Sequence, residues 1–334
     1  MKTNLTCFAG SDRQVDALAS YFLLDLLGED RLSLKADGLK ICGDMFLMDF
    51  RDTGDLEGIC LAIKTYEKAA ACLSVDDPRL GGFLNDISYA YGERHERFGL
   101  LDDVQERITT IQKVVAITAE GDVIFPKLVS NLGSTFALRF ERTGDLHDLS
   151  EAIQYQQRAV QSAPDGYPVL PLFLIKLGNS FQHRFTYTGD LQYISEAILH
   201  YQRAIQLMPD QADPVHNFGV ALAVRFDQTG DIHDNFEAIR HLQRAVQLTP
   251  DGHVELPIRL NNLGNSFMAR FERNGDMGDI SEAIRLQQRA VQLTPDGHRS
   301  GSKILDSHFC VASNTLEKCM IFQRQSKICN MPSN

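Results

Sequence analysis

Apolar residues recur along the chain at the three- and four-residue spacing of amphipathic helices, in segments that end at glycine or proline. In one clear example, Leu132, Phe136 and Phe140 mark a single helical stripe, which Gly144 follows. A second helical segment comes next and stops at the Pro-Asp-Gly turn of residues 164–166. No strand pattern is evident. The sequence therefore predicts an all-α chain built from pairs of helices.

This helix pair is one copy of an internal repeat. A glycine ends a Thr-Gly-Asp-like turn six times, at intervals of 45 residues with a single interval of 41, at Gly54, Gly99, Gly144, Gly189, Gly230 and Gly275. A small residue stands eleven positions before each of them, at Gly43, Ser88, Gly133, Gly178, Gly219 and Gly264. Because one helix pair cannot bury its apolar stripe, stability must come from stacking the copies.

Each helix of the repeat carries signals at its ends. Pro126, Pro171 and Pro257 suit the first turn of the first helix, where a missing N–H is harmless. The turn glycine suits the end of that helix, because glycine enters the left-handed conformation without steric strain. Asp148 and Glu151 have the spacing of a capping box, which predicts that Asp148 caps the second helix.

Small residues are predicted where the two helices of a repeat cross. Helices approach to about 8 Å only when the side chains at the crossing are small. Gly133 on the first helix, with Ala152 and Ala159 on the second, supply this closeness in the third copy.

The repeat spans residues 36–299 and leaves a segment outside it at each end. Residues 1–35 are predicted to form a capping region, with a helix over 12–28 that covers the apolar face of the first repeat. Residues 300–334 depart from the repeat, since Phe309 and Met320 stand where a small residue and a turn glycine are due. This tail is either a partly disordered, makeshift cap or a foreign sequence that replaces further repeats and an effector domain. The abrupt end of the pattern favours the second alternative.

The repeat resembles the tetratricopeptide repeat through Leu132, Gly133, Phe136, Ala152, Ala159 and Pro164. That family's motif has Leu-Gly and an aromatic residue on its first helix, two small residues on its second and a proline at its end. The copies here are seven residues longer, and we predict the surplus between the two helices, over 141–147. The resemblance implies a right-handed α-solenoid of about six repeats, whose first helices line a concave groove.

The longer period is similar to the arrays of fungal tetratricopeptide proteins, many of which carry a C-terminal CHAT domain, a caspase-like cysteine peptidase fold. The resemblance does not extend to that domain. It implies a non-catalytic protein–protein interaction scaffold that binds a peptide or helix segment in its groove. The alternative is the regulatory or sensing portion of a CHAT-type protein whose catalytic domain is missing from this chain. A prenyltransferase α-subunit is disfavoured by the absence of Trp and by the 45-residue period.

Asparagines gather around the small position of the first helix, where the family holds the backbone of an extended peptide. We predict the peptide-binding groove at Asn131, Asn179, Asn217, Asn262, Asn265 and His183. A primary amide offers two donors and an acceptor and so pairs with any peptide group. The alternative interpretation is that these amides are surface positions or bonds between helices.

An arginine recurs six residues after the small position, at Arg94, Arg139, Arg184, Arg225 and Arg270. One interpretation is a basic ladder for acidic peptides. Its strict recurrence favours the other interpretation, in which each arginine pairs with an acid near the adjoining turn.

Composition and charge narrow the class of function. The chain is 43% hydrophobic and 23% charged, as in a folded soluble protein, and its formal net charge of -11 argues against nucleic-acid and anionic-membrane partners. Seven irregularly spaced cysteines predict reduced thiols and a cytoplasmic location. His308 and Cys310 lie too close along one segment to act as base and nucleophile, and no cysteine spacing matches a metal site. We expect no enzyme activity, no cofactor, no metal and a protein or peptide partner; the pattern carries no signal for the oligomeric state.

Overall fold

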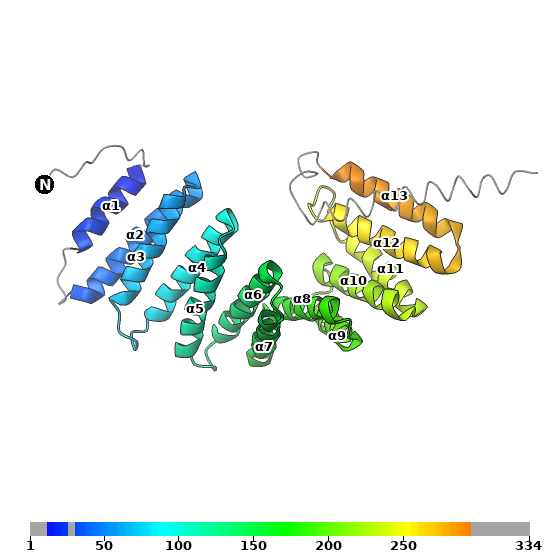
Figure 1. The fold of residues 1–334 in the computed structure, drawn as a ribbon, viewed down its shortest axis with the longest axis horizontal. Coiled ribbons are helices and arrows are strands. Elements are labelled where there is room, and N and C mark those ends of the chain that lie inside the picture. The colour runs from blue at the N-terminus through cyan, green and yellow to red at the C-terminus, as the bar shows by residue number, and fades with distance from the viewer. Residues whose placement is uncertain (1–11, 26–30, 295–334) are drawn as a thin grey trace, which may run out of the picture. The chain divides into compact units, whose positions relative to one another are not determined.

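The computed structural model describes residues 12–25 and 31–294, which form thirteen α-helices and no strand (Figure 1). After α1 (Asp12–Asp25), they form six pairs: α2 (Leu32–Thr53) and α3 (Leu56–Ala71), α4 (Leu80–Phe98) and α5 (Leu101–Ile117), α6 (Phe125–Thr143) and α7 (Leu146–Ser162), α8 (Leu170–Thr188) and α9 (Leu191–Leu207), α10 (Ala212–Thr229) and α11 (Ile232–Gln247), α12 (Leu256–Asn274) and α13 (Met277–Leu293). The prediction of an all-α chain of six helical repeats is confirmed. The predicted tail at 300–334 and the end of the predicted helix over 12–28 lie outside the described residues.

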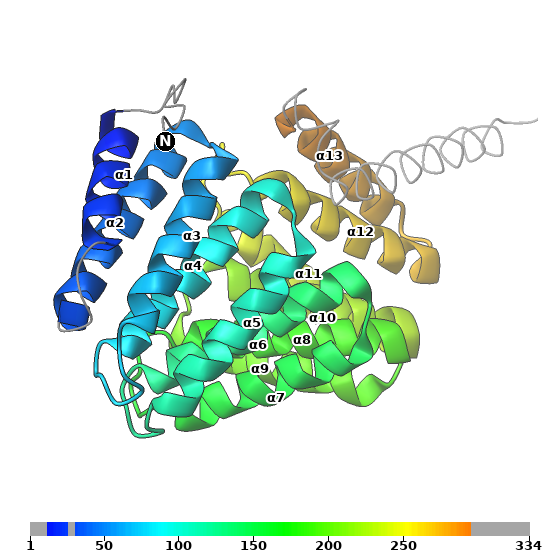
Figure 2. The same ribbon diagram turned by 60° about the vertical axis from the view of Figure 1, so that its left-hand side comes forward.

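The helices divide into two compact units of three repeats each. Unit 1 spans residues 1–165 and contains α1 to α7, and unit 2 spans 166–334 and contains α8 to α13. Within each unit, successive helices pack side by side, and in unit 2 the first helix α10 also contacts the first helices α8 and α12. Figure 2 shows α1 alongside α2, where Ala17 is fully buried and Leu18, Tyr21 and Leu24 pack against the core of the first repeat.

Two residues link the helices of each repeat. Gly144 ends α6 in the left-handed conformation with φ +73°, and its N–H donates to Phe140 O at 2.7 Å. The other five turn glycines are also left-handed, as predicted. The placement of the seven surplus residues between the helices is wrong. Residues 141–143 form the last turn of α6 and residues 146–147 begin α7, so the surplus lengthens the helices.

The residue after the turn glycine caps the second helix. The Asp145 side chain accepts a hydrogen bond of 2.9 Å from the His147 N–H, and Asp190, Asp231 and Asp276 cap their helices in the same way. The prediction that Asp148 is the cap is therefore wrong. Asp148 lies inside the first turn of α7, and the helix begins directly after Asp145.

Asp148 instead forms an ion pair with Arg139, across the two helices of the repeat. Arg139 Nε donates to Asp148 Oδ2 at 2.8 Å, and a second, shorter bond joins Nη2 to Oδ1. Two-pronged pairs of the same kind join Arg94 to Asp103, Arg225 to Asp234 and Arg270 to Asp279. The four aspartate side chains are only 1–5% exposed. The prediction that each arginine pairs with an acid near the turn is confirmed for these four repeats.

The two remaining repeats replace the pair. In the fourth repeat Tyr193 stands at the aspartate position, and the Arg184 guanidinium lies over its ring at 5.8 Å from the centroid. In the first repeat both members are absent, with Asp49 in the place of the arginine and Gly58 in the place of the aspartate. Every repeat that carries the arginine thus has either an aspartate or an aromatic ring at the partner position.

The repeat glycine lies where the two helices cross. A Cβ at Gly178 would lie 2.6 Å from a ring carbon of Tyr201, and one at Gly133 would lie 3.0 Å from the Ala152 carbonyl oxygen. The predicted role of small residues at the crossing is confirmed by these approaches.

The ion pair predicts a large effect from a single charge. Asp234→Asn leaves the Arg225 guanidinium, whose side chain is 29% exposed, without its counter-ion, so we expect the free energy of unfolding to fall by about 1–3 kcal/mol. Asp231→Asn, three residues away, is the matched control, because asparagine caps helices as well as aspartate does. Urea denaturation followed by circular dichroism measures both. Equal midpoints for the two variants would contradict the assignment.

The crossing predicts opposite outcomes for two glycine-to-alanine changes. Gly178→Ala forces Tyr201 or the backbone to move, so we expect a loss of about 1–3 kcal/mol in stability. Gly82→Ala, in the first turn of α4 with open space around it, should instead raise stability by at most about 1 kcal/mol. Thermal unfolding of the two variants beside the wild type checks the sign of each change.

Candidate functional site

The first helices of unit 2 carry four of the predicted asparagines at two equivalent positions. Asn179 on α8 and Asn265 on α12 follow the repeat glycine by one residue, and Asn217 on α10 and Asn262 on α12 precede it by two. All four amides are hydrogen-bonded to side chains of a neighbouring helix. The interpretation of these amides as bonds between helices is therefore confirmed, and peptide binding by them stays a prediction.

The amides that follow the glycine use their oxygens inside the protein. Asn179 Oδ1 accepts from the Tyr201 hydroxyl at 2.7 Å, and Asn265 Oδ1 accepts from Gln287 Nε2 at 3.0 Å. Burial raises the pKa of Tyr201, so its hydroxyl keeps the proton that it donates. Among the described residues no acceptor bonds Nδ2 of Asn179 or Asn265. Both residues therefore offer an amide donor.

The amides that precede the glycine are bonded in the opposite sense. Asn217 Nδ2 donates to Asn179 Oδ1 at 3.3 Å, and Asn262 Nδ2 lies 3.2 Å from His216 Nε2. Burial, together with the Arg259 guanidinium, lowers the pKa of His216 to about 4, so the neutral ring accepts this bond. The side-chain oxygens of Asn217 and Asn262 have no donor among the described residues. These two residues offer acceptors.

The two other predicted site residues do not join this arrangement. Asn131 lies half-buried on α6 in unit 1, whereas the other predicted asparagines lie in unit 2. His183 lies half-buried on α8, one turn after Asn179.

A pocket of about 160 Å³ lies beside two of these amides, between α10 and α12. Apolar side chains form most of its wall: Val220, Ala223, Val224, Leu242 and Ala269. Asn262, Asn265 and Ser266 line it from α12, and Asp227 lines it from α10. The repeat pattern of the sequence does not predict this pocket.

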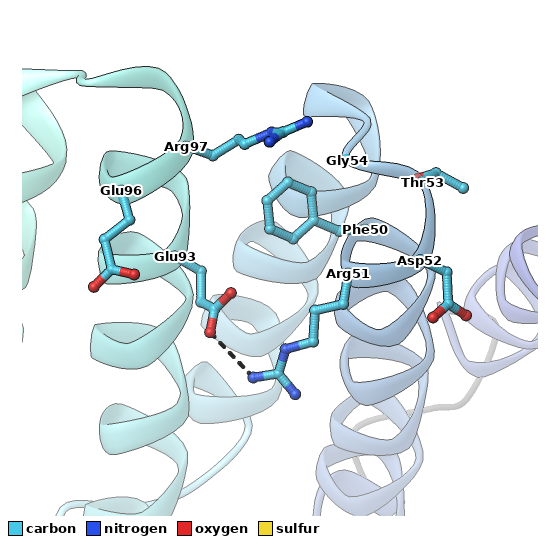
Figure 3. A pocket seen from close by; sticks show the side chains of 8 residues that line it. All are labelled: Phe50, Arg51, Asp52, Thr53, Gly54, Glu93, Glu96 and Arg97. Carbon is cyan, nitrogen blue, oxygen red and sulfur yellow. Dashed lines mark hydrogen bonds and ion pairs between the residues drawn. The ribbon is translucent and has the colours of Figure 1, made fainter. Parts of the chain in front are cut away.

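Unit 1 has a larger hollow of about 390 Å³ at the ends of α2 and α4 (Figure 3). Arg51 Nη2 lies 3.2 Å from Glu93 Oε1 within it, and Arg97 extends across Phe50 toward Gly54. In unit 2 Arg273 likewise lies over the Phe226 ring, at 5.2 Å, and against the turn glycine. Because this arrangement recurs, we interpret the hollow as a packing feature of neighbouring repeats.

The described part of the chain holds no group of three or more His, Cys, Asp or Glu side chains placed to bind a metal ion. Within residues 12–25 and 31–294, every helix is too short or too polar to cross a membrane.

The comparisons with known proteins concern the fold. No protein-family model matches the chain, and no curated protein matches it. The C-terminal part of a TPR repeat-containing protein from Cytophaga hutchinsonii superposes with a TM-score of 0.54 at 11% identity, over 84% of this chain and 99% of its own. The structure of the APC/C hetero-tetramer Cut9–Hcn1 superposes with a TM-score of 0.50 at 15% identity, over 92% of this chain and 46% of its own. The fold is that of a tetratricopeptide-repeat solenoid.

In this solenoid, the bond between Asn262 and His216 predicts a dependence of stability on pH. The unfolded chain protonates His216 below about pH 6.5, whereas the folded chain does so only near pH 4, so stability falls as the pH falls between these values. We expect wild type to lose about 2–3 kcal/mol more than His216→Gln between pH 7 and pH 4.5. Urea denaturation at the two pH values measures this difference. The same substitution at the exposed His147 is the control, and it should leave the wild-type pH dependence in place.

Proposed function

We propose that the chain is a non-catalytic protein-interaction scaffold that binds an extended segment of a protein partner along the first helices of unit 2. The observation that carries the proposal is the alternation of amide donors at Asn179 and Asn265 with amide acceptors at Asn217 and Asn262. An extended peptide presents N–H and C=O groups in alternation, whatever its sequence. Donors and acceptors held at fixed spacing are complementary to such a backbone.

The internal bonds of the four amides favour binding. Each amide is already oriented by Tyr201, Gln287, His216 or its neighbouring asparagine. Little side-chain entropy is therefore lost when a peptide pairs with the free half of the amide. The TPR-type fold supports the same class of function, because its first helices carry these positions side by side.

The proposal includes a cytoplasmic location, a protein or peptide partner and no cofactor. Cys42, Cys60 and Cys72, the cysteines within the described residues, are free thiols, which suits a reducing compartment. The capture experiment below also tests whether a caspase-like module is among the partners.

Removing the amides should remove the partner. We expect the variant with alanine at Asn179, Asn217, Asn262 and Asn265 to recover at least one partner about tenfold or more below the wild-type level, because several peptide hydrogen bonds are lost together. The measurement is affinity capture of the full chain from the native cell, with the recovered proteins quantified by mass spectrometry. The matched control replaces three exposed amides on α7, at Gln154, Gln157 and Gln161, by alanine.

Circular dichroism must first show that both variants keep their helices. Equal recovery of every partner by the asparagine variant, the glutamine variant and the wild type would reject the proposed surface.

A further inference from the structure

We propose that the pocket between α10 and α12 holds one aliphatic side chain of the bound segment, and that a neighbouring lysine or arginine of the same segment pairs with Asp227. This inference rests on the proposed function and adds the chemical class of the partner segment to it. The pocket and Asp227 both belong to unit 2, and Asn262 and Asn265 line the same pocket.

The size of the pocket matches one medium-sized side chain. Its volume is about 160 Å³, and an apolar cavity of about 150 Å³ in another protein accommodates a benzene molecule. Val220, Val224 and Leu242 provide an apolar wall, so a Leu, Ile or Met side chain exchanges water for close contact there.

The amides at the same pocket can hold the backbone beside the anchored side chain. Asn262 offers its Oδ1 and Asn265 its Nδ2, and the two residues lie one turn apart on the same face of α12. One face therefore presents an acceptor, a donor and an apolar recess. This set suits the N–H, the C=O and the side chain of a residue in an extended segment.

The acid at the pocket accounts for the basic neighbour. The Asp227 side chain is exposed and forms no ion pair with any described residue. Partial burial by the surrounding protein and the nearby Glu272 carboxylate raise its pKa. Arg273, the cation that also acts on Asp227, lies over the Phe226 ring. A cation supplied by the partner would meet two carboxylates here, which favours lysine or arginine over a neutral residue.

The combination is particular to α10. The three positions that Val220, Ala223 and Val224 occupy on α10 hold Asn179, Gln182 and His183 on α8. Those larger polar side chains replace an apolar wall in the fourth repeat. At these positions α10 thus presents an apolar wall where α8 presents polar side chains.

The test uses a phage-displayed library of random twelve-residue peptides, selected against the full chain. We expect the enriched peptides to share an aliphatic residue and a lysine or arginine at a fixed spacing. Ala223→Leu fills the pocket from within, and it should weaken the best synthetic peptide by about 10- to 100-fold in a fluorescence polarisation titration. Ala137→Leu on α6 is the matched control, because it stands at the equivalent position four residues after the repeat glycine of unit 1. It should change the affinity by less than about twofold.

Asp227→Asn separates the two halves of the inference. Selection against this variant should keep the aliphatic residue and lose the preference for lysine or arginine. Retention of the basic residue would overturn the assignment of Asp227.

The outcomes also distinguish this inference from the proposed function. Peptides that need the four asparagines and bind Ala223→Leu as tightly as wild type would overturn the pocket and leave the scaffold proposal standing. Enrichment of no peptide, or of peptides indifferent to the asparagines, would overturn both. Circular dichroism of each variant confirms that a lost affinity is not a lost fold.

Discussion

In four of the six repeats a nearly buried carboxylate, paired with an arginine, holds the second helix against the first, and the positions of the side chains around the crossing depend on this contact. A carboxylate that is at most 5% exposed must be neutralised where it lies, and the two-pronged bond to arginine satisfies it in one orientation only. In the repeats that carry it, the pair therefore fixes both the rotation and the axial shift of the second helix against the first. The repeat glycine makes this possible, because it lets the helices approach closely enough for the arginine to reach. Because the close crossing at the glycine recurs from repeat to repeat, the residues just before and after the glycine also recur at a constant spacing within each unit.

Much of this architecture could be predicted from the sequence, because the six copies of the repeat can be compared with one another. A glycine at a 45-residue interval marks a turn, and an arginine that recurs six residues after the small position indicates a partner of equally strict recurrence. In the fourth copy Tyr193 stands at the position of Asp148, a departure that the sequence shows but does not explain. The structure assigns it to the ion pair, since Asp190 still caps α9 and Arg184 stacks on Tyr193. Two acids at the start of one helix look alike in sequence, and only the position of the first helical residue separates their roles.

The polarity of the amides could not be predicted, because it depends on contacts between helices. Which half of Asn179 or Asn265 stays free is decided by a residue on the second helix, 23 positions after the repeat glycine. The aromatic residue at this position in the fourth copy belongs to the pattern of the repeat, yet its hydroxyl acts as a donor only because α8 and α9 cross at Gly178. The pocket was missed for a related reason. Its apolar wall is formed by Val220, Ala223 and Val224 on α10, Leu242 on α11 and Ala269 on α12, which come together only when the three helices pack.

The first two repeats of unit 1 place carboxylates where unit 2 places amides, and this comparison shows what the architecture leaves free to vary. Asp44 and Asp86 occupy the same two repeat positions as Asn179 and Asn217, and a tyrosine hydroxyl from the second helix donates to the first member of each pair. The carboxylates face a lysine, since Lys40 Nζ lies 3.0 Å from Asp44 and 3.3 Å from Asp86. Burial, and the neighbouring Asp44, raise the pKa of Asp86 despite this lysine. The same geometry thus carries an internally satisfied charge cluster in unit 1 and open peptide-like groups in unit 2. Because aspartate and asparagine have nearly the same shape, the fold tolerates either, so the proposed binding surface can differ between the units while the architecture stays the same.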